Sequence, residues 1–339
     1  MARLELLFLS GDDISKLELG AGEVLDVVEQ GLRAHGEGAV VMPPKDHLSL
    51  EQRYGGHFNI LKGYVEAFDL AGVKVIGDYV DNYRHGLPSE LALLTLYRAE
   101  TGAPVALPEA TELTWMRTGA VSAIGARYLA RPRSRTLCHI GARGTAGCNV
   151  RYLDHLFNFE TIRVTSRRPE SRERFAAEMT KALGKPVVAF ETVRGAAEGA
   201  DIIVDATRLN TEQTLLRNDW ISPGALVIPY GAVRSTDPEL PLVADKFVVD
   251  DWDQAAASEF GHYYRLIESG TLRHEHVHAE IGEIVAGLAP GRESDDETIV
   301  FWHRGFAISD IAIGALALRR AAERAIGTTL TLASDVRES

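Results

Sequence analysis

The stretch Thr136-Leu137-Cys138-His139-Ile140-Gly141-Ala142-Arg143-Gly144-Thr145-Ala146-Gly147 decides the fold. Strand-forming residues end at Gly141, a turn of small residues follows, and residues 148–157 have the character of a helix. In such a strand–turn–helix unit, the backbone N–H groups and the dipole of the helix start can hold a pyrophosphate. Glycine lets the anion approach the backbone closely. The stretch therefore predicts the first unit of a dinucleotide-binding domain.

The turn departs from the usual G-x-G-x-x-A spacing. Gly141 and Ala146 fill the outer positions, but Arg143 stands at the middle position and Gly144 comes one place later. A glycine pattern alone is a weak signal, so a tight turn without a ligand is the alternative. We expect contacts with the cofactor from Gly141, Arg143, Gly144, Thr145 and Ala146.

A second strand is predicted over residues 161–166, where the ribose-reading residue of such domains is expected. No acidic residue ends it; Ser166, Arg167 and Arg168 stand there instead. Two guanidinium groups and a hydroxyl suit a 2′-phosphate better than a free 2′-hydroxyl. The pattern favours NADP(H) and leaves NAD(H) possible; the alternative is a solvated arginine loop. Thr118, and Thr207 after a strand at 200–206, are further expected cofactor contacts.

The bulk composition is that of a globular protein with two domains. The chain has 339 residues, 45% hydrophobic and 25% charged, with a formal net charge of −12. The negative charge argues against nucleic acid or an anionic membrane as partner. We see no membrane-spanning apolar run and no targeting segment. Cys138 and Cys148 are expected to be free thiols in a reducing cytoplasm.

The order of elements indicates an α/β protein. From residue 135 to about 250, strands and helices alternate, which predicts a parallel, doubly wound sheet. The part before it is β-rich, with strands expected at 4–9, 57–68, 71–77 and 89–97, and helices at 21–36 and 111–130. After it we expect a helix at 276–286, a strand at 298–302 and a long helix at 308–325.

Two basic residues stand out as candidates for chemistry. Lys74 lies inside an apolar strand; a desolvated lysine has a lowered pKa and can transfer protons, whereas the alternative is an exposed strand face. Arg117 stands among apolar and small residues and suits a carboxylate or a cofactor phosphate, unless it is a cation on a helix surface. Lys45, after two prolines, is uninformative by itself.

A metal site and a hydrolytic serine are not predicted. His274 and His278 would share a helix face, as zinc ligands do, but no third ligand follows, and a polar helix start is the better interpretation. The serines lack a nucleophile-elbow pattern.

An ordered set of short motifs, from about Val41 to Leu332, resembles the ornithine cyclodeaminase and mu-crystallin family. The motifs are Gly72-Val73-Lys74-Val75, Asn82 with Gly86-Leu87-Pro88, Thr101-Gly102-Ala103-Pro104, Leu113-Thr114 with Arg117-Thr118, Tyr128-Leu129-Ala130, His278-Ala279-Glu280-Ile281-Gly282-Glu283-Ile284, Gly287, Gly291-Arg292 and Gly305-Phe306-Ala307.

The resemblance implies a fold and an activity. A NAD(P)-binding Rossmann domain, residues 131–305, is inserted into a β-rich substrate-binding and dimerisation domain, residues 1–130 plus 306–339. The implied homodimer joins its β-rich domains. The implied chemistry is hydride transfer between a nicotinamide and the α-carbon of a small amino or imino acid. Lys74 then is the catalytic lysine, beside the substrate carboxylate. Arg117 binds that carboxylate, and Lys45 takes the place of a second arginine.

Three positions depart from the family pattern. Ornithine-cyclising members have an aspartate where this chain has Val233, and valine cannot act as a base. Arg143 replaces a glycine of the turn, and His303-Arg304 precede Gly305 where the family has a serine. The sequence therefore favours an NAD(P)H-dependent ketimine reductase or amino-acid dehydrogenase. A cyclodeaminase with bound NAD is the alternative, and a non-catalytic binding protein is a third interpretation.

Overall fold

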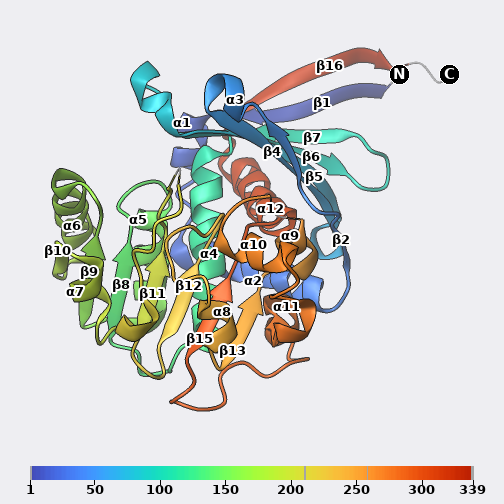
Figure 1. Ribbon diagram of the computed structural model, residues 1–339. Helices are drawn as coiled ribbons and strands as arrows, with labels where there is room; N and C mark the ends of the chain where they lie inside the picture. Colours follow the sequence, from blue (N-terminus) through green and yellow to red (C-terminus); the bar gives the residue numbers. More distant parts are fainter. Residues whose placement is uncertain (1, 210, 258, 337–339) are drawn as a thin grey trace. The chain divides into compact units, whose positions relative to one another are not determined.

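A computed structural model describes residues 2–209, 211–257 and 259–336 (Figure 1). The chain divides into two compact units. One contains both ends of the chain, Met1–Arg117 with Phe306–Ser339, and we call it the split unit. The other, Thr118–Gly305, is the inserted unit. The division falls within helix α4 (Thr111–Leu129).

The split unit is built on a mixed sheet with the order β16-β1-β7-β6-β5-β4-β2, and β3 pairs with β4. Its strands are β1 (Ala2–Leu9), β2 (Val40–Val41), β3 (Asp46–Ser49), β4 (Gly56–Val65), β5 (Leu70–Tyr79), β6 (Glu90–Arg98), β7 (Pro104–Pro108) and β16 (Thr328–Val336). Its helices are α1 (Gly11–Lys16), α2 (Ala21–Gly36), α3 (Glu51–Tyr54) and α12 (Ala307–Arg324), with 3-10 turns η1 (Glu66–Phe68) and η2 (Val80–His85). The prediction of a β-rich part is confirmed.

Two details of this unit differ from the sequence-based expectation. The strand expected over residues 57–68 ends at Val65, because a 3-10 turn follows and Asp69 takes a left-handed conformation with φ 50°. Strand β16, which was not predicted, pairs antiparallel with β1, so the first and the last strand of the chain lie side by side (Figure 1).

Helix α12 packs closely on the inner face of this sheet, against β4, β5 and β6, and on α2. Two glycines permit the approach. A Cβ atom on Gly72 would lie 2.7 Å from Ile311 of the helix, and one on Gly314 would lie 2.7 Å from Leu94 of β6. Contacts this short are too close for carbon atoms. The glycines therefore fix α12 directly over β5.

The outer face of the same sheet carries exposed apolar side chains. Because side chains alternate along a strand, residues two apart face the same way. Val75 of β5 is paired with Ile60 of β4 and Leu93 of β6, which makes one apolar row across three strands. Val75, Leu91 and Leu93 are 40%, 42% and 49% exposed. A soluble domain rarely leaves such a row uncovered without a reason.

The inserted unit is a parallel sheet with the order β10-β9-β8-β11-β12-β15-β13-β14. Its strands are β8 (Thr136–Ile140), β9 (Thr161–Thr165), β10 (Val187–Phe190), β11 (Ile202–Asp205), β12 (Leu226–Pro229), β13 (Lys246–Val249), β14 (Ala279–Glu280) and β15 (Ile299–Trp302). The first five, taken in chain order, read 3-2-1-4-5 across the sheet. This is the doubly wound Rossmann order, so the predicted fold class is confirmed.

Helices cover both faces of that sheet. They are α5 (Ala146–Phe157), α6 (Pro169–Leu183), α7 (Val193–Ala197), α8 (Leu240–Val243), α9 (Trp252–Ala256), α10 (His262–Glu268) and α11 (Ile281–Val285), with 3-10 turns η3 (Asn218–Trp220) and η4 (His274–His276). Residues of α7 to α10 form one core with β8, β11, β12, β13 and β15. On the other face, Gly125 of α4 lies so near the Phe301 ring that a Cβ atom would be 2.3 Å away.

The helix predicted over 276–286 is wrong in its first half. The chain there forms the turn η4, then β14 paired with β13, and only Ile281–Val285 is helical. Pairing with the sheet edge has displaced the local helical pattern. In the described ranges, no helix combines the length and the apolar character needed to cross a lipid bilayer.

Candidate active site

Lys74 is buried on the inner face of β5. Its neighbours across the sheet are Leu61 of β4 and Leu94 of β6. The side chain is 1% exposed, and its Nζ atom lies 2.6 Å from Oδ1 of Asp310 and 3.2 Å from the hydroxyl of Thr114. The Thr114 hydroxyl donates to the carbonyl of Ala110, so it accepts from the ammonium group. An exposed strand face, the alternative for Lys74, is therefore wrong.

Arg117 of α4 points to the same carboxylate. Its Nε atom lies 2.9 Å from Oδ1 of Asp310, and the two side chains are 9% and 3% exposed. Arg117 is thus buried rather than a helix-surface cation. Asp310 was not singled out from the sequence, although it is an acidic residue within an apolar stretch of α12. A carboxylate in such a stretch signals a buried partner.

Burial sets the protonation of Lys74. Desolvation and the positive charge of Arg117 lower the pKa of Lys74, Asp310 opposes both effects, and the net pKa is about 8. A lysine with a pKa near 8 exchanges protons readily at neutral pH. The cluster therefore combines a proton donor with a guanidinium group that is able to bind a carboxylate. Lys45 lies half-buried just before β3.

In the inserted unit, the glycine turn lies at the point where the strand order reverses. β8 and β11 are neighbours, with Ile140 paired to Asp205, and Gly141 and Ala206 follow directly. Gly141 has φ 111°, and a Cβ atom there would lie 3.0 Å from the carbonyl of Ala206. In open α/β sheets, ligands bind beside this reversal point.

The turn has the features of an anion cradle. Gly144 also has a positive φ, 56°. Thr145 is the N-cap residue of α5, and its side chain makes no capping hydrogen bond to the helix. Gly119 of α4 brings the start of α5 close, because a Cβ atom would meet the Cys148 carbonyl carbon at 2.8 Å. The uncapped start of a twelve-residue helix suits a pyrophosphate. Ala146 is the first residue of α5 and is buried.

A buried polar network holds this turn from below. Nδ1 of His139 donates to the carbonyl of Gly141 at 2.8 Å, which leaves Nε2 to accept from Asn149 at 3.2 Å. Asn149 also donates to the Tyr230 hydroxyl at 3.1 Å, and that hydroxyl bonds to Thr145. Burial lowers the pKa of His139 to about 4, so its ring is neutral at pH 7. No role for His139, Asn149 or Tyr230 is predicted from the sequence.

Cations gather where β9 ends. Arg167 and Arg168 are exposed, and the Ser166 hydroxyl donates to the Arg168 carbonyl at 3.2 Å. From the glycine turn, the Arg143 guanidinium reaches Ser171 of α6 at 3.5 Å. Arg172 of α6 donates to the carbonyl of Ser166 at 3.2 Å. Guanidinium groups from two loops and a helix thus lie near one strand end.

Thr207 and Thr118, the other two residues expected to contact the cofactor, lie in the inserted unit. Thr207 is half-buried, and Thr118 is buried. Thr207 follows β11, and its hydroxyl donates to Asp205 at 2.8 Å. The Ser235 hydroxyl donates to the same carboxylate at 2.6 Å. Burial raises the pKa of Asp205 despite these bonds. Thr118 in α4 is 6% exposed, and its carbonyl accepts from Ser122.

Two residues that depart from the family pattern, Val233 and His303, are buried. Val233 is 3% exposed within the apolar core, and its carbonyl accepts from the His262 N–H at 2.7 Å. The His303 ring stacks on Tyr230 with centroids 5.0 Å apart, and its Nε2 atom lies 2.9 Å from the Ser122 hydroxyl. The position to which the family resemblance assigns an aspartate thus holds a buried valine.

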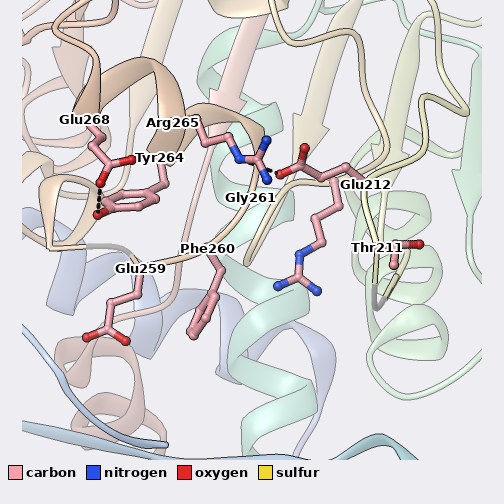
Figure 2. A pocket seen from close by; sticks show the side chains of 9 residues that line it. Thr211, Glu212, Glu259, Phe260, Gly261, Tyr264, Arg265 and Glu268 are labelled. Atoms are coloured by element: carbon pink, nitrogen blue, oxygen red, sulfur yellow. Dashed lines mark hydrogen bonds and ion pairs between the residues drawn. The ribbon is translucent and has the colours of Figure 1, made fainter. Parts of the chain in front are cut away.

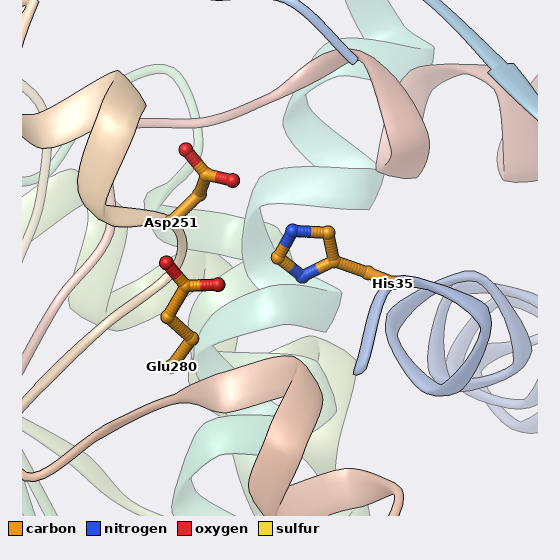
Figure 3. Close-up of side chains that lie close together, drawn as sticks. All are labelled: His35, Asp251 and Glu280. Carbon is orange, nitrogen blue, oxygen red and sulfur yellow. The ribbon is translucent and has the colours of Figure 1, made fainter. Parts of the chain in front are cut away.

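The candidate zinc histidines do not share a helix face. His274 lies in the turn η4, while Nε2 of His278 donates to the carbonyl of Pro290 at 2.9 Å. Figure 3 shows two acidic residues of this unit, Asp251 and Glu280, which have local roles. Asp251 caps α9 by accepting from the Gln254 N–H, and Glu280 accepts from the Trp252 N–H, each at 2.8 Å.

A separate pocket of about 370 Å³ lies in the inserted unit (Figure 2). Some of its lining groups contact one another: Nε of Arg265 lies 3.1 Å from Oε1 of Glu212, and the Tyr264 hydroxyl donates to Glu268 at 3.2 Å. None of the site residues expected from the sequence lines it. The lining residues are Thr211, Glu212, Arg234, Glu259, Phe260, Gly261, Tyr264, Arg265 and Glu268.

The sequence profile of the ornithine cyclodeaminase/mu-crystallin family matches residues 5–325. The chain belongs to this family. Among its relatives is an alanine dehydrogenase from Archaeoglobus fulgidus, 29% identical over 330 residues, which are 96% of this chain and 98% of the relative. The resemblance inferred from the short motifs is therefore confirmed.

Two solved structures of family members are close to this fold. The Delta(1)-pyrroline-2-carboxylate reductase of Thermococcus litoralis, in complex with NADH and L-proline, is 33% identical, with a TM-score of 0.89 and coverage of 95% of this chain and 99% of that one. An archaeal alanine dehydrogenase dimer with bound NAD is 28% identical, with a TM-score of 0.89 and coverage of 97% and 100%. The family therefore includes enzymes that are named for amino or imino acids and that were solved with a bound nicotinamide cofactor.

Proposed function

We propose that the protein is an NADP(H)-dependent ketimine reductase or amino-acid dehydrogenase. It is an oxidoreductase that transfers a hydride at the α-carbon of a small amino or imino acid. The observation that carries this proposal is the buried pair of Lys74 and Arg117, with the pKa of Lys74 near 8. Its family relatives act on alanine and on pyrroline-2-carboxylate.

Each residue of the cluster has a task in this reaction. Arg117 binds the substrate carboxylate through its guanidinium fork. Lys74 donates a hydrogen bond to the same substrate and assists proton transfer as the α-carbon changes its oxidation state. Lys45 contributes a further positive charge. The nicotinamide, when bound, supplies or accepts the hydride.

The cofactor sits on the glycine turn and the end of β9. Gly141, Gly144 and the start of α5 fit a pyrophosphate, and Arg143, Ser166, Arg167 and Arg168 fit a 2′-phosphate. Thr118, Thr145, Ala146 and Thr207 complete the expected contacts. The two solved structures hold NADH or NAD, whereas the guanidinium cluster of this chain favours NADP(H).

The buried Val233 separates this proposal from a cyclodeaminase. Ornithine-cyclising members use an aspartate there, and this side chain is 3% exposed in a core. Reduction of an imine by a hydride involves no attacking water or amine, so this direction of the reaction needs no such group. The presence of Lys74 and Arg117 likewise argues against a protein that only binds a ligand.

The proposed assembly is a homodimer joined through the outer face of the split unit. The apolar row of Ile60, Val75 and Leu93 supplies a surface that a second copy would cover. The archaeal alanine dehydrogenase was solved as a dimer. We also place the protein in the cytoplasm, because Cys138 and Cys148 are buried thiols that are not joined in a disulfide.

A substrate screen tests the proposal. Purified protein is mixed with NADPH or NADH and with pyrroline-2-carboxylate, or with 2-oxo acids plus ammonia or methylamine, and absorbance at the nicotinamide band is followed. We expect NADPH to be consumed with at least one imino acid. Tightly bound NAD on the purified protein, with release of ammonia from ornithine and no net NADPH use, would instead identify a cyclodeaminase.

A further inference from the structure

One carboxylate of α12 joins the two cations of the candidate active site. Oδ1 of Asp310 is shared by Lys74, at 2.6 Å, and by Arg117, at 2.9 Å. The second oxygen, Oδ2, is buried and has no hydrogen-bond partner among the described residues. The three side chains are between 1% and 9% exposed, so water does not screen their charges.

The backbone around Asp310 is held firmly. Its neighbour Ile311 packs against Gly72 of β5, two positions from Lys74, and Gly314 one turn later packs against Leu94 of β6. Asp310 itself is 2% exposed. Since the helix and the strand interlock on both sides, the carboxylate has little freedom to move relative to the ammonium group.

The contact with Asp310 balances part of the positive charge in this buried site. Lys74 and Arg117 carry two positive charges into a buried site, and Asp310 contributes one negative charge. The only other charged group acting on Lys74 among the described residues is Glu90 of β6, and its effect is weaker than that of Asp310. Without Asp310, two buried cations would face each other at high cost.

Among the described residues, the hydrogen bonds of the Lys74 ammonium group leave one of its N–H donors without a partner. Lys74 has three N–H donors; one points to Asp310 and one to Thr114. We propose that Asp310 is the positioning residue of this site, holding Lys74 and Arg117 as one fixed pair and aiming the third N–H of Lys74 at the substrate. This inference rests on the proposed reductase function. It names a residue that the reaction needs although that residue does not touch the substrate.

The same carboxylate keeps Lys74 protonated. Asp310 raises the pKa of Lys74 against the effects of burial and of Arg117. Removing its charge therefore lowers the pKa below about 8. An opposite charge within about 4–6 Å typically shifts a pKa by roughly one to three units.

Asp310→Asn tests the inference, because asparagine keeps the shape and removes the charge. We expect kcat/KM with the best imino substrate of the screen to fall by about a hundredfold, and its basic limb to move to lower pH by about one to three units. Glu323→Gln is the matched control, since Glu323 lies on the same helix with its side chain 55% exposed. Its rate and pH profile should equal those of the unmodified protein.

A binding measurement gives a readout besides turnover. Pyrrole-2-carboxylate, a planar carboxylate that cannot be reduced by hydride, is titrated calorimetrically into the NADPH-loaded protein. Asp310→Asn should weaken its affinity at least tenfold, because Arg117 and Lys74 no longer form a fixed pair. Wild-type affinity together with an unmoved basic limb in folded Asp310→Asn would overturn the inference.

If Asp310→Asn does not fold, Asp310→Glu tests the positioning role instead. Glutamate keeps the charge and displaces it by one methylene, so the basic limb should stay in place while kcat falls and KM rises. Wild-type kcat and KM in this variant would refute a positioning role. The proposed function has its own test. If Lys74→Ala retains turnover, the assignment of Lys74 as the catalytic lysine is wrong. If Lys74→Ala is inactive but Asp310→Asn has the kinetics of the unmodified protein, only the role of Asp310 is refuted.

Discussion

Nζ of Lys74 lies 2.6 Å from Oδ1 of Asp310, although the two residues are 236 positions apart in the chain. Strand β5 and helix α12 bring them together, and the Arg117 guanidinium meets the same oxygen. We propose this buried triad as the catalytic centre of the split unit.

Lys74→Ala should lower kcat by about a hundredfold or more, the usual effect of removing an acid–base group. Steady-state NADPH oxidation with the best imino acid measures this. Lys16→Ala is the control, because the Lys16 side chain on α1 is 65% exposed. Near-normal turnover by a folded Lys74→Ala protein would contradict the assignment.

Arg117→Lys should raise the KM for the imino acid about tenfold or more while the charge is kept. The reason is that lysine cannot bind a carboxylate through two parallel N–H groups, as the guanidinium fork does. The KM for NADPH should stay unchanged. Arg33→Lys, on the exposed side of α2, controls for the substitution itself. An unaltered KM for the imino acid would show that Arg117 does not bind it bidentately.

The stability of the protein should depend on the protonation of Lys74. Its pKa is about 8 in the folded chain and 10.5 in an ordinary setting, so the unfolded chain binds more protons between these values. Stability therefore rises with pH across that window relative to Lys74→Met. The relative gain is at most roughly 3 kcal/mol, from about 1.4 kcal/mol per pKa unit.

Urea unfolding of both proteins at pH 7.5, 9 and 10.5 measures this difference. Groups distant from Lys74 titrate alike in both proteins, so their contributions cancel in the comparison. A difference that stays constant over the three pH values would mean that Lys74 titrates normally in the folded state.

NADPH should be preferred over NADH by about tenfold or more in kcat/KM. Each charge-assisted contact with the 2′-phosphate contributes about 1.5–3 kcal/mol, and one such contact suffices for that ratio. Changing Ser166 to Asp together with Arg167 to Ala should reverse the preference, because the new carboxylate accepts from the ribose hydroxyls and repels the phosphate. Arg174→Ala, on the exposed face of α6 with a side chain 62% exposed, is the control. Better kinetics with NADH in the unmodified protein would reject NADP(H) as the preferred cofactor.

Leu93→Glu should dissociate the proposed dimer. Leu93 is 49% exposed beside Val75 on the outer face of the sheet, and a charge buried there in an interface is costly. Light scattering at micromolar concentration should give a dimer for the unmodified protein and a monomer for the variant. Leu288→Glu, at a side chain 68% exposed in the inserted unit, should remain dimeric. A monomeric unmodified protein would exclude the assembly.

The sequence by itself determined the Rossmann part of this protein. The run from Thr136 to Gly147 predicted a strand, a glycine turn and a helix, and the structure has β8, Gly141 with φ 111° and α5 there. Alternating strands and helices predicted a parallel sheet. These features can be predicted from the sequence because glycine conformation and apolar periodicity are local properties of the chain.

The tertiary structure alone decided what surrounds Lys74. No local pattern shows that Asp310 of α12 meets Lys74 of β5 and Arg117 of α4, or that β16 pairs with β1. The sequence also predicted a helix where β14 joins the sheet edge at residues 279–280. In each case the deciding contact joins segments distant in the chain. Burial then fixes the partners, because a charge or a strand edge removed from water must find its complement elsewhere in the fold.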